Sequence, residues 1–288
     1  MFVKVASTSS TKLAHLASLP LATQTVALWW LGQAGFALRG DGVTLLLDPF
    51  LSAHRHRIDP PAFAADQAAG IDAVLISHEH IDHLDGPSIP GIAAASPDAA
   101  FIVPTPIAPQ LRDRGVPAER IIDAQPGEAV RLGRLTVHPV PAAHGVHVSD
   151  AYNFGRELSG GLTRYLGYVV ELSGVRVYHA GDTIPYEGMT ETIRGLKADL
   201  ALLPINGRDR FREAQDLVGN MDHREAAQLA AEAGVDLLVP MHYEMFPSNL
   251  GFPAHLVEIV RRNYPDLNVL VPGKSRPFVY APGALPSG

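Results

Sequence analysis

The sequence predicts an α/β (α+β) protein in which two mixed β-sheets pack together and helices cover them on the outside. Short apolar runs joined by glycine-containing turns indicate β-hairpins in both halves of the chain. Strand–helix units also occur in both halves, without the regular alternation of an all-parallel sheet. We therefore expect each half to supply most of one sheet, and a site where strand ends from the two halves meet.

The first half of the chain predicts two helices and several short strands. An amphipathic pattern over 11–19, ended by Pro20, indicates one helix, and 106–114, stopped by Gly115, indicates another. Apolar runs bounded by turn residues give the predicted strands 26–31, 36–38, 43–47, 72–76 and 101–103. The run 72–76 leads directly into a histidine-rich segment.

The second half of the chain also predicts helices and short strands. Asp222 is a good N-cap with Glu225 as its capping-box partner, so a helix is expected up to Ala233 and Gly234. A further helix is expected over 254–263. Apolar runs predict strands at 130–132, 135–140, 165–172, 175–179, 200–203, 237–241 and 268–271.

Composition limits the class of protein. The 288 residues include no cysteine, which excludes disulfides, thiol nucleophiles and thiolate metal ligands. The net charge of −7 argues against nucleic acid as a partner, because phosphate binding needs a basic surface. We find neither a signal-peptide pattern nor a membrane-spanning run. We expect a cytoplasmic protein that acts on a small molecule, without a membrane or nucleic-acid partner.

The segment His78-Glu79-His80-Ile81-Asp82-His83 carries the strongest chemical signal. Three imidazoles and an aspartate follow a buried strand within six residues, and these are the usual ligands of zinc, manganese and iron at catalytic sites. Solvated histidines on a surface loop are the alternative, but chance rarely produces this spacing. Glu79 points the other way on an extended loop and is expected to be structural. The segment predicts metal binding.

Further ligand-type residues follow three other predicted strands. His144, Asp182 and His242 each appear where an apolar run ends and the chain leaves the core. Each one alone is as well explained by an ordinary loop hydrogen bond. Together with the histidine segment they indicate a complete metal site.

These residues resemble, in identity and order, the metallo-β-lactamase-fold hydrolase superfamily, and the resemblance spans most of the chain. Other segments are similar to its L-ascorbate-6-phosphate lactonase branch, although that branch is longer and lacks a clear histidine at the position of His144. The segments are Trp29-Trp30-Leu31-Gly32-Gln33-Ala34-Gly35-Phe36, Tyr178-His179-Ala180-Gly181-Asp182-Thr183, Leu203-Pro204-Ile205-Asn206-Gly207 and Pro240-Met241-His242-Tyr243.

The resemblance implies a four-layer αββα sandwich formed by a single domain, 1–288, with an N-terminal extension at 1–25. It also implies two divalent cations, manganese or zinc, with iron as a further option, and assembly into a homo-oligomer. His78, His80 and His144 would hold the first cation, and Asp82, His83 and His242 the second. Asp182 would bridge them, and Asp48 would support the histidine segment from behind. His147 is an alternative to His144.

The implied activity is metal-dependent hydrolysis, in which two cations about 3.5–4 Å apart make a bridging hydroxide available at neutral pH. The expected substrate is a small lactone, with or without a phosphate group, such as L-ascorbate 6-phosphate. The alternative is a small phosphodiester or a phospholipid headgroup. A di-iron redox protein and a non-catalytic metal-stabilised protein are less consistent with the residues.

The remaining catalytic candidates rest on weaker signals. Asp82 could orient the nucleophile, and Asn206 could reach the site because it directly follows an apolar strand. His223, Tyr243 and Tyr186 are candidates for protonating the leaving group, although His223 could equally be an exposed residue in the first turn of its helix.

Two further features have a structural and a functional interpretation. Arg208, Arg210 and Arg212 could bind an anionic substrate, or could pair with nearby carboxylates on a solvated loop. Trp29 and Trp30 are expected to pack in the core rather than to contact substrate.

Overall fold

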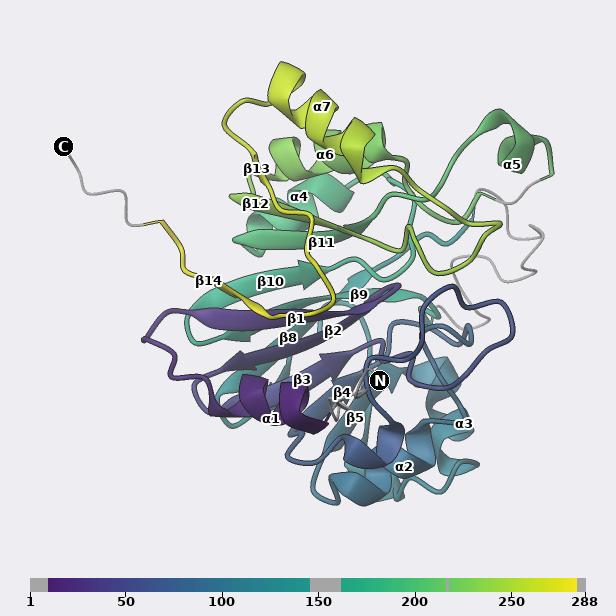
Figure 1. Cartoon of the computed structure of the whole chain (residues 1–288), viewed down its shortest axis with the longest axis vertical. Helices are drawn as coiled ribbons and strands as arrows, with labels where there is room; N and C mark the ends of the chain where they lie inside the picture. Colours follow the sequence, from purple (N-terminus) through teal and green to yellow (C-terminus); the bar gives the residue numbers. More distant parts are fainter. Residues whose placement is uncertain (1–9, 146–161, 216–217, 284–288) are drawn as a thin grey trace, which may run out of the picture.

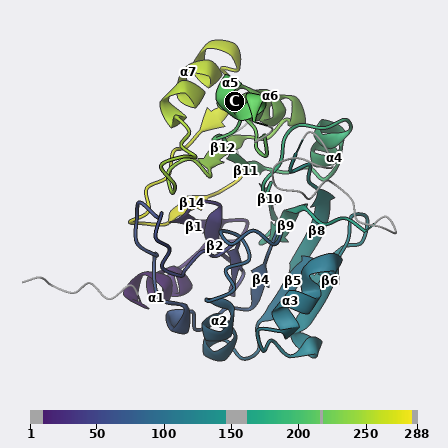
Figure 2. The same cartoon turned by 90° about the vertical axis from the view of Figure 1, so that its right-hand side faces the viewer.

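Two seven-stranded sheets lie against each other in the computed structural model, which describes residues 10–145, 162–215 and 218–283 (Figure 1 and Figure 2). The first sheet has the order β14-β1-β2-β3-β4-β5-β6. Its strands are β1 (Val26–Gly32), β2 (Gly35–Gly40), β3 (Val43–Leu47), β4 (Ala73–Leu75), β5 (Ala100–Pro104), β6 (Ile121–Ala124) and β14 (Phe278–Tyr280).

The second sheet comes from the later part of the chain, in the order β13-β12-β11-β10-β9-β8-β7. Its strands are β7 (Val130–Leu132), β8 (Leu135–Pro141), β9 (Leu166–Leu172), β10 (Val175–His179), β11 (Leu200–Pro204), β12 (Leu237–Met241) and β13 (Asn268–Val269). Each half of the chain therefore supplies most of one sheet, as expected, and only β14 crosses back to the first.

Helices cover the outer face of each sheet (Figure 1). On the first sheet these are α1 (Ser10–Ser18), α2 (Ile89–Ala95) and α3 (Ala108–Arg112). On the second they are α4 (Met189–Gly195), α6 (His223–Ala233) and α7 (Pro253–Asn263), while the short α5 (Arg210–Ala214) projects away from the sheets. The predicted fold class, two mixed sheets flanked by helices, is confirmed.

Alternating side chains of β1 explain how the layers hold together. Val26, Leu28 and Trp30 enter the main core, which extends from between the sheets to the helices of the second sheet. Ala27, Trp29 and Leu31 face the other way, into a separate cluster under α1, α2 and α3. Because successive side chains of a strand point to opposite faces, an entirely apolar strand such as β1 must be buried on both sides.

The direction of the strands positions the candidate ligands. β3 and β4 are parallel in the first sheet, and β10, β11 and β12 are parallel in the second. β8 runs in the same direction as β10, because both are antiparallel to β9. The segments that follow β8, β10 and β12 therefore leave the second sheet at one edge. The segment that follows β4 lies beside them, because its histidines come close to His144, Asp182 and His242.

Most predicted elements are present, with differences that have local causes. The helix expected over 106–114 is instead a short 3-10 turn, Thr105–Ile107, followed by α3, because Pro106 and Pro109 lack the N–H groups that a continuous helix needs. The helix capped by Asp222 forms as predicted, with the Asp222–Glu225 capping box and a left-handed Gly234. No helix in the described part of the chain is long and apolar enough to span a membrane.

Candidate metal centre

Four side chains converge in the first candidate metal group: His78, His80, His144 and Asp182. His80 Nδ1 lies 2.9 Å from His78 Nε2 and 3.1 Å from His144 Nε2. The Nδ1 atom of His144 is 2.6 Å from the carbonyl oxygen of Gly219. That contact places the ring proton on Nδ1 and leaves the Nε2 lone pair for the group.

The second candidate metal group consists of Asp82, His83 and His242. His242 Nε2 lies 3.2 Å from Asp82 Oδ2, and His83 Nε2 lies 3.8 Å from the same oxygen. Both histidines are buried, whereas Asp82 remains 14% exposed. The structure brings together the residues that the sequence assigned to two sets with Asp182 between them, and their binding of cations stays a prediction.

Asp182 links the two groups. Its Oδ2 atom lies 3.6 Å from His144 Nε2 in the first group and 3.2 Å from His242 Nε2 in the second. Its Oδ1 atom lies 3.3 Å from His83 Nε2, yet both of these atoms are buried without a hydrogen bond. Buried polar atoms without partners are costly, and a cation bound between them would satisfy both through their lone pairs once His83 Nε2 has lost its proton. The donor set therefore fits a centre of two divalent cations.

The histidines of the first group are suited to bind a cation without losing a proton. Burial, reinforced by the neighbouring His144, lowers the pKa of His80 to about 3. Burial also lowers the pKa of His144, and it lowers the pKa of His78 well below its ordinary value. At neutral pH all three rings are uncharged, which is the form that ligates metals.

The histidines of the second group have raised pKa values, in contrast to those of the first. Burial by itself favours the neutral ring of His242, but the charges and hydrogen bonds of Asp182 and Asp82 together outweigh it, and the pKa of His242 rises to about 9. The pKa of His83 is likewise raised, because Asp182, Asp48 and Asp82 together outweigh its burial. These histidines carry positive charge in the metal-free protein at neutral pH.

We expect cation binding to the two groups to differ in its dependence on pH. The first group holds neutral rings at pH 7, whereas the second must release the proton of His242 and that of His83. Titration calorimetry with zinc at pH 7, in buffers of different ionisation enthalpy, should detect about one to two protons released on filling the second group and almost none on filling the first. His242→Ala isolates the first group. Equal proton release from both groups would contradict this assignment.

Asp48 supports the histidine segment from behind, as the sequence predicted. Its Oδ2 atom is 2.7 Å from His83 Nδ1 and accepts a 2.6 Å hydrogen bond from Ser77 Oγ. Its Oδ1 atom accepts the backbone N–H of Ser77 at 2.7 Å. The carboxylate orients the His83 ring so that Nε2 faces the second group.

Backbone conformations at two ligand-bearing turns are restricted by close packing. Gly181, next to Asp182, has a φ of +60°, and a Cβ atom there would lie 2.7 Å from the carbonyl oxygen of Leu166. His242 has a φ of +59°, which is uncommon outside glycine. Strained residues of this kind persist where their surroundings fix them, and they cluster at functional sites.

A cleft of about 270 Å³ opens onto both groups. Candidate ligands form one side of it: His80, Asp82, His144, Asp182 and His242. The other described residues that line it are uncharged: Ile81, Asn220, Phe246, Ser248 and Asn249. A small molecule entering this cleft would meet both metal groups at once.

The other predicted catalytic residues lie outside this lining. Asn206 is buried behind the wall and donates a 2.6 Å hydrogen bond to Asn249 Oδ1. Tyr243 stacks on Trp30 with ring centroids 5.2 Å apart, and burial raises its pKa. Tyr186 donates a hydrogen bond to the carbonyl oxygen of Pro141, 2.6 Å away. His223 lies beside His255 at the start of α6.

Other sequence predictions have the following outcomes. Arg208 pairs with Glu213 and Glu225, and Arg212 pairs with Asp209, so these arginines form ion pairs with nearby carboxylates. Both tryptophans pack in the core, as expected. Glu79 is structural, because it pairs with Arg164 and accepts a hydrogen bond from Gln110. The alternative ligand His147 lies outside the described residues.

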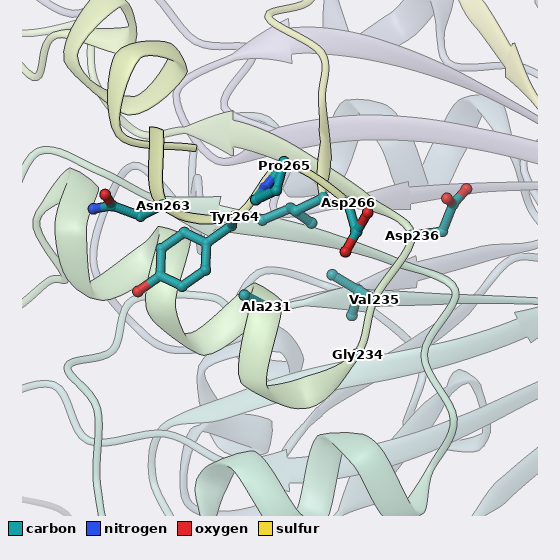
Figure 3. A pocket seen from close by; sticks show the side chains of 9 residues that line it. Ala231, Gly234, Val235, Asp236, Asn263, Tyr264, Pro265 and Asp266 are labelled. Atoms are coloured by element: carbon teal, nitrogen blue, oxygen red, sulfur yellow. The ribbon is translucent and has the colours of Figure 1, made fainter. Parts of the chain in front are cut away.

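A larger hollow lies between the end of α6 and the segment that follows α7 (Figure 3). It has a volume of about 480 Å³, but none of the candidate metal ligands lines it. One of its carboxylates, Asp236, already accepts hydrogen bonds from Asn268 and Tyr280. We assign the chemistry to the smaller cleft because the donor atoms converge there.

The fold and the site define a metal-dependent hydrolase, and comparison with known proteins identifies the family. The chain belongs to the beta-lactamase superfamily, whose domain model matches residues 44–243. It is 33% identical over 222 residues to a UPF0173 metal-dependent hydrolase of Methanoculleus marisnigri, covering 77% of this chain and 82% of the relative. It is 30% identical over 252 residues to one of Myxococcus xanthus, covering 86% of this chain and 81% of the relative.

A solved structure supports the fold assignment. The metallo hydrolase Igni18 from Ignicoccus hospitalis superimposes with a TM-score of 0.65 and 24% sequence identity, covering 89% of this chain and 98% of that chain. At this level of identity the likeness concerns the fold alone.

Several residues around the centre were not predicted from the sequence. Gln33 contacts Asp82 and His242, while Asn220 and Asn249 line the cleft. Gln33 stood between Gly32 and Gly35 in a segment that resembles the lactonase branch, but nothing in that segment singled out its side chain. Asn220 and Asn249 lie in loops, where a single sequence does not separate substrate-facing amides from solvent-facing ones.

Proposed function

We propose that this protein hydrolyses a small, uncharged ester of the lactone type at a centre of two divalent cations. The observation that carries the proposal is the position of Asp182, whose two carboxylate oxygens face ligand atoms of both metal groups. A carboxylate placed in this way could hold two cations close together, as a two-cation hydrolytic centre needs.

The chain supplies the donor set for both cations. His78, His80 and His144 would hold the first, while Asp82, His83 and His242 would hold the second, with Asp182 between them. When bound, such cations would supply a nucleophilic hydroxide at neutral pH and polarise the carbonyl group whose carbon is attacked. Asp82 faces the cleft and could orient the attacking water. Imidazole and carboxylate donors suit zinc, manganese and iron, and we propose zinc or manganese.

The described residues of the cleft wall support an uncharged substrate. Asn249 accepts a hydrogen bond from Asn206 through Oδ1, so its amide nitrogen is oriented to donate into the cleft. Phe246 and Ile81 add apolar surface. Arg208 and Arg212, which could have bound a phosphate group, are paired with carboxylates outside the lining. We therefore favour a neutral lactone over L-ascorbate 6-phosphate.

Metal analysis followed by a substrate comparison tests the proposal. We expect two cations per chain after reconstitution with zinc or manganese. We also expect a higher kcat/KM on a neutral γ-lactone than on its phosphorylated analogue or on bis(4-nitrophenyl) phosphate. A chain that binds no cation would refute the metal centre. A preference for the phosphodiester would refute the substrate class and favour the phosphodiesterase alternative.

Replacing Asn249 by alanine should raise KM on the lactone about tenfold with a smaller change in kcat, because one hydrogen bond to the bound substrate is lost. Steady-state kinetics of the reconstituted enzyme measure both constants. The control is Asn268→Ala, which removes an exposed amide that contacts Asp236, away from the cleft. An unchanged KM in Asn249→Ala would exclude Asn249 from substrate binding.

A further inference from the structure

Gln33 occupies a tightly fixed position in the turn between β1 and β2. Its backbone N–H donates to Glu244 Oε1 at 3.0 Å, and its carbonyl oxygen accepts the backbone N–H of His242 at 3.0 Å. The same carbonyl accepts the Trp30 indole N–H at 3.0 Å. Gln33 is 1% exposed and has a φ of +54°, a conformation that non-glycine residues adopt only when their surroundings impose it.

The side-chain amide of this buried residue points at the second metal group. Its Nε2 atom lies 2.7 Å from Asp82 Oδ2 and 3.0 Å from His242 Nε2. Both of these atoms are candidate ligand atoms. Gln33 is absent from the lining of the cleft, so its amide approaches the group from the protein side.

We propose that Gln33 is a positioning residue of the second metal group, which holds the Asp82 carboxylate in place by donating a hydrogen bond to Oδ2. This inference rests on the proposed two-cation centre. A carboxylate oxygen that binds a cation through one lone pair can still accept an N–H through another, and such outer contacts fix the orientation of the ligand.

Asp82 is the member of the group that most needs such support. Its side chain is 14% exposed, against 0% for His83 and 3% for His242. His83 is already held by Asp48 through Nδ1, and the backbone of His242 is held by the Gln33 carbonyl. The amide of Gln33 provides the corresponding contact for Asp82, so one residue supports two of the three ligands.

The expected effect is confined to one of the two cations. The contacts of the Gln33 amide are with Asp82 and His242, both in the second group. The first group is built on different contacts, such as that of His144 with the Gly219 carbonyl. A loss of support at Gln33 should therefore weaken the second cation and leave the first unchanged, which general destabilisation would not do.

The test uses Gln33→Leu and Gln33→Glu in the full chain. Both remove the N–H donor, and Gln33→Glu keeps the shape of the side chain. Titration calorimetry and elemental analysis with zinc and with manganese should show the second cation bound roughly ten- to a hundredfold more weakly, with the first cation unchanged. Gln215→Leu, a change to an exposed glutamine at the end of α5, is the matched control and should bind both cations as the wild type does.

The outcomes separate this inference from the proposed function. A wild-type chain that binds no cation refutes the two-cation centre itself. If the wild type binds two cations and the variants bind both of them equally well, the role of Gln33 is refuted and the two-cation centre is not. A second cation held as tightly or more tightly in Gln33→Glu also overturns it, because residue 33 would then act as a direct ligand. Circular dichroism of the metal-free variants checks folding; if Gln33→Leu does not fold, Gln33→Glu decides.

Discussion

Replacing Asp182 by alanine is expected to prevent both cations from binding tightly and to lower kcat/KM roughly 10³-fold, equivalent to about 4 kcal/mol of transition-state stabilisation. The reason is geometric, since its two oxygens face His144 on one side and His83 and His242 on the other. No single histidine has such a position between the groups. Elemental analysis and steady-state kinetics on the reconstituted enzyme measure the two effects.

A second readout does not depend on knowing the substrate. Cations that bind only the folded state raise its stability, so zinc should raise the Tm of the wild type and have little effect on Asp182→Ala. The matched control is Asp266→Ala, which removes an exposed carboxylate beside the larger hollow. Two tightly bound cations in Asp182→Ala would contradict the shared-carboxylate arrangement. Lost activity in Asp266→Ala would instead direct attention to the hollow in Figure 3.

Asp48→Ala should have the largest effect on stability, reducing the free energy of unfolding of the metal-free protein by about 3–5 kcal/mol. The substitution leaves the raised-pKa His83 without one of its carboxylates and removes the acceptor of the Ser77 backbone and hydroxyl groups. Removing one partner of a buried pair costs more than the pair itself contributes. Urea denaturation of the metal-free protein measures the loss.

The same variant should also bind the second cation roughly ten- to a hundredfold more weakly, because the His83 ring loses the contact that orients it. Asp48→Asn, which retains the shape of the side chain, should lie between the wild type and Asp48→Ala in both measurements. Asp123→Ala removes an exposed carboxylate on β6 and serves as the control. An unchanged unfolding free energy in Asp48→Ala would show that the buried network contributes nothing to stability.

The clustering of the candidate ligands could be predicted from the sequence because each segment that carries them follows an apolar strand. His78 comes after β4, Asp182 after β10 and His242 after β12, so the end of each hydrophobic run marked the place where a ligand could appear. The α6 helix was predictable for a similar reason, since Asp222 and Glu225 form a capping box from residues close in sequence. Signals of this kind are local.

Apart from the contact of Asp48, which the family resemblance implied, the supporting contacts could not be predicted, because they join residues far apart in the chain. Gln33 contacts Asp82, and Asn206 contacts Asn249, and neither partner can be identified from the other in a single sequence. The same limit applies to Arg208, whose partner Glu225 lies on α6. Its ion pairs, rather than its loop composition, decide whether it is available to bind an anion.

Some elements were missed because their local signals are weak. α2 is only one to two turns long and contains Gly91, which is unfavourable in a helix, yet Gly91 is needed where the helix packs on the segment at Ala65. β14 is only partly buried and lacks a long apolar run. Both are stabilised by tertiary packing that overrides local preference.

The pairing of β14 with β1 has a consequence for biosynthesis. β1 is made early, but the edge of β1 that pairs with Phe278–Tyr280 stays open until the ribosome has added those residues. The Trp29 indole N–H likewise cannot form its hydrogen bond until Lys274, which supplies the acceptor carbonyl oxygen, has been added. During translation the nascent chain therefore exposes an apolar, unpaired strand edge, which is a template for aggregation. Completion of the first sheet, which also contains β4 and so the start of the histidine segment, therefore comes only after Phe278–Tyr280 have been added.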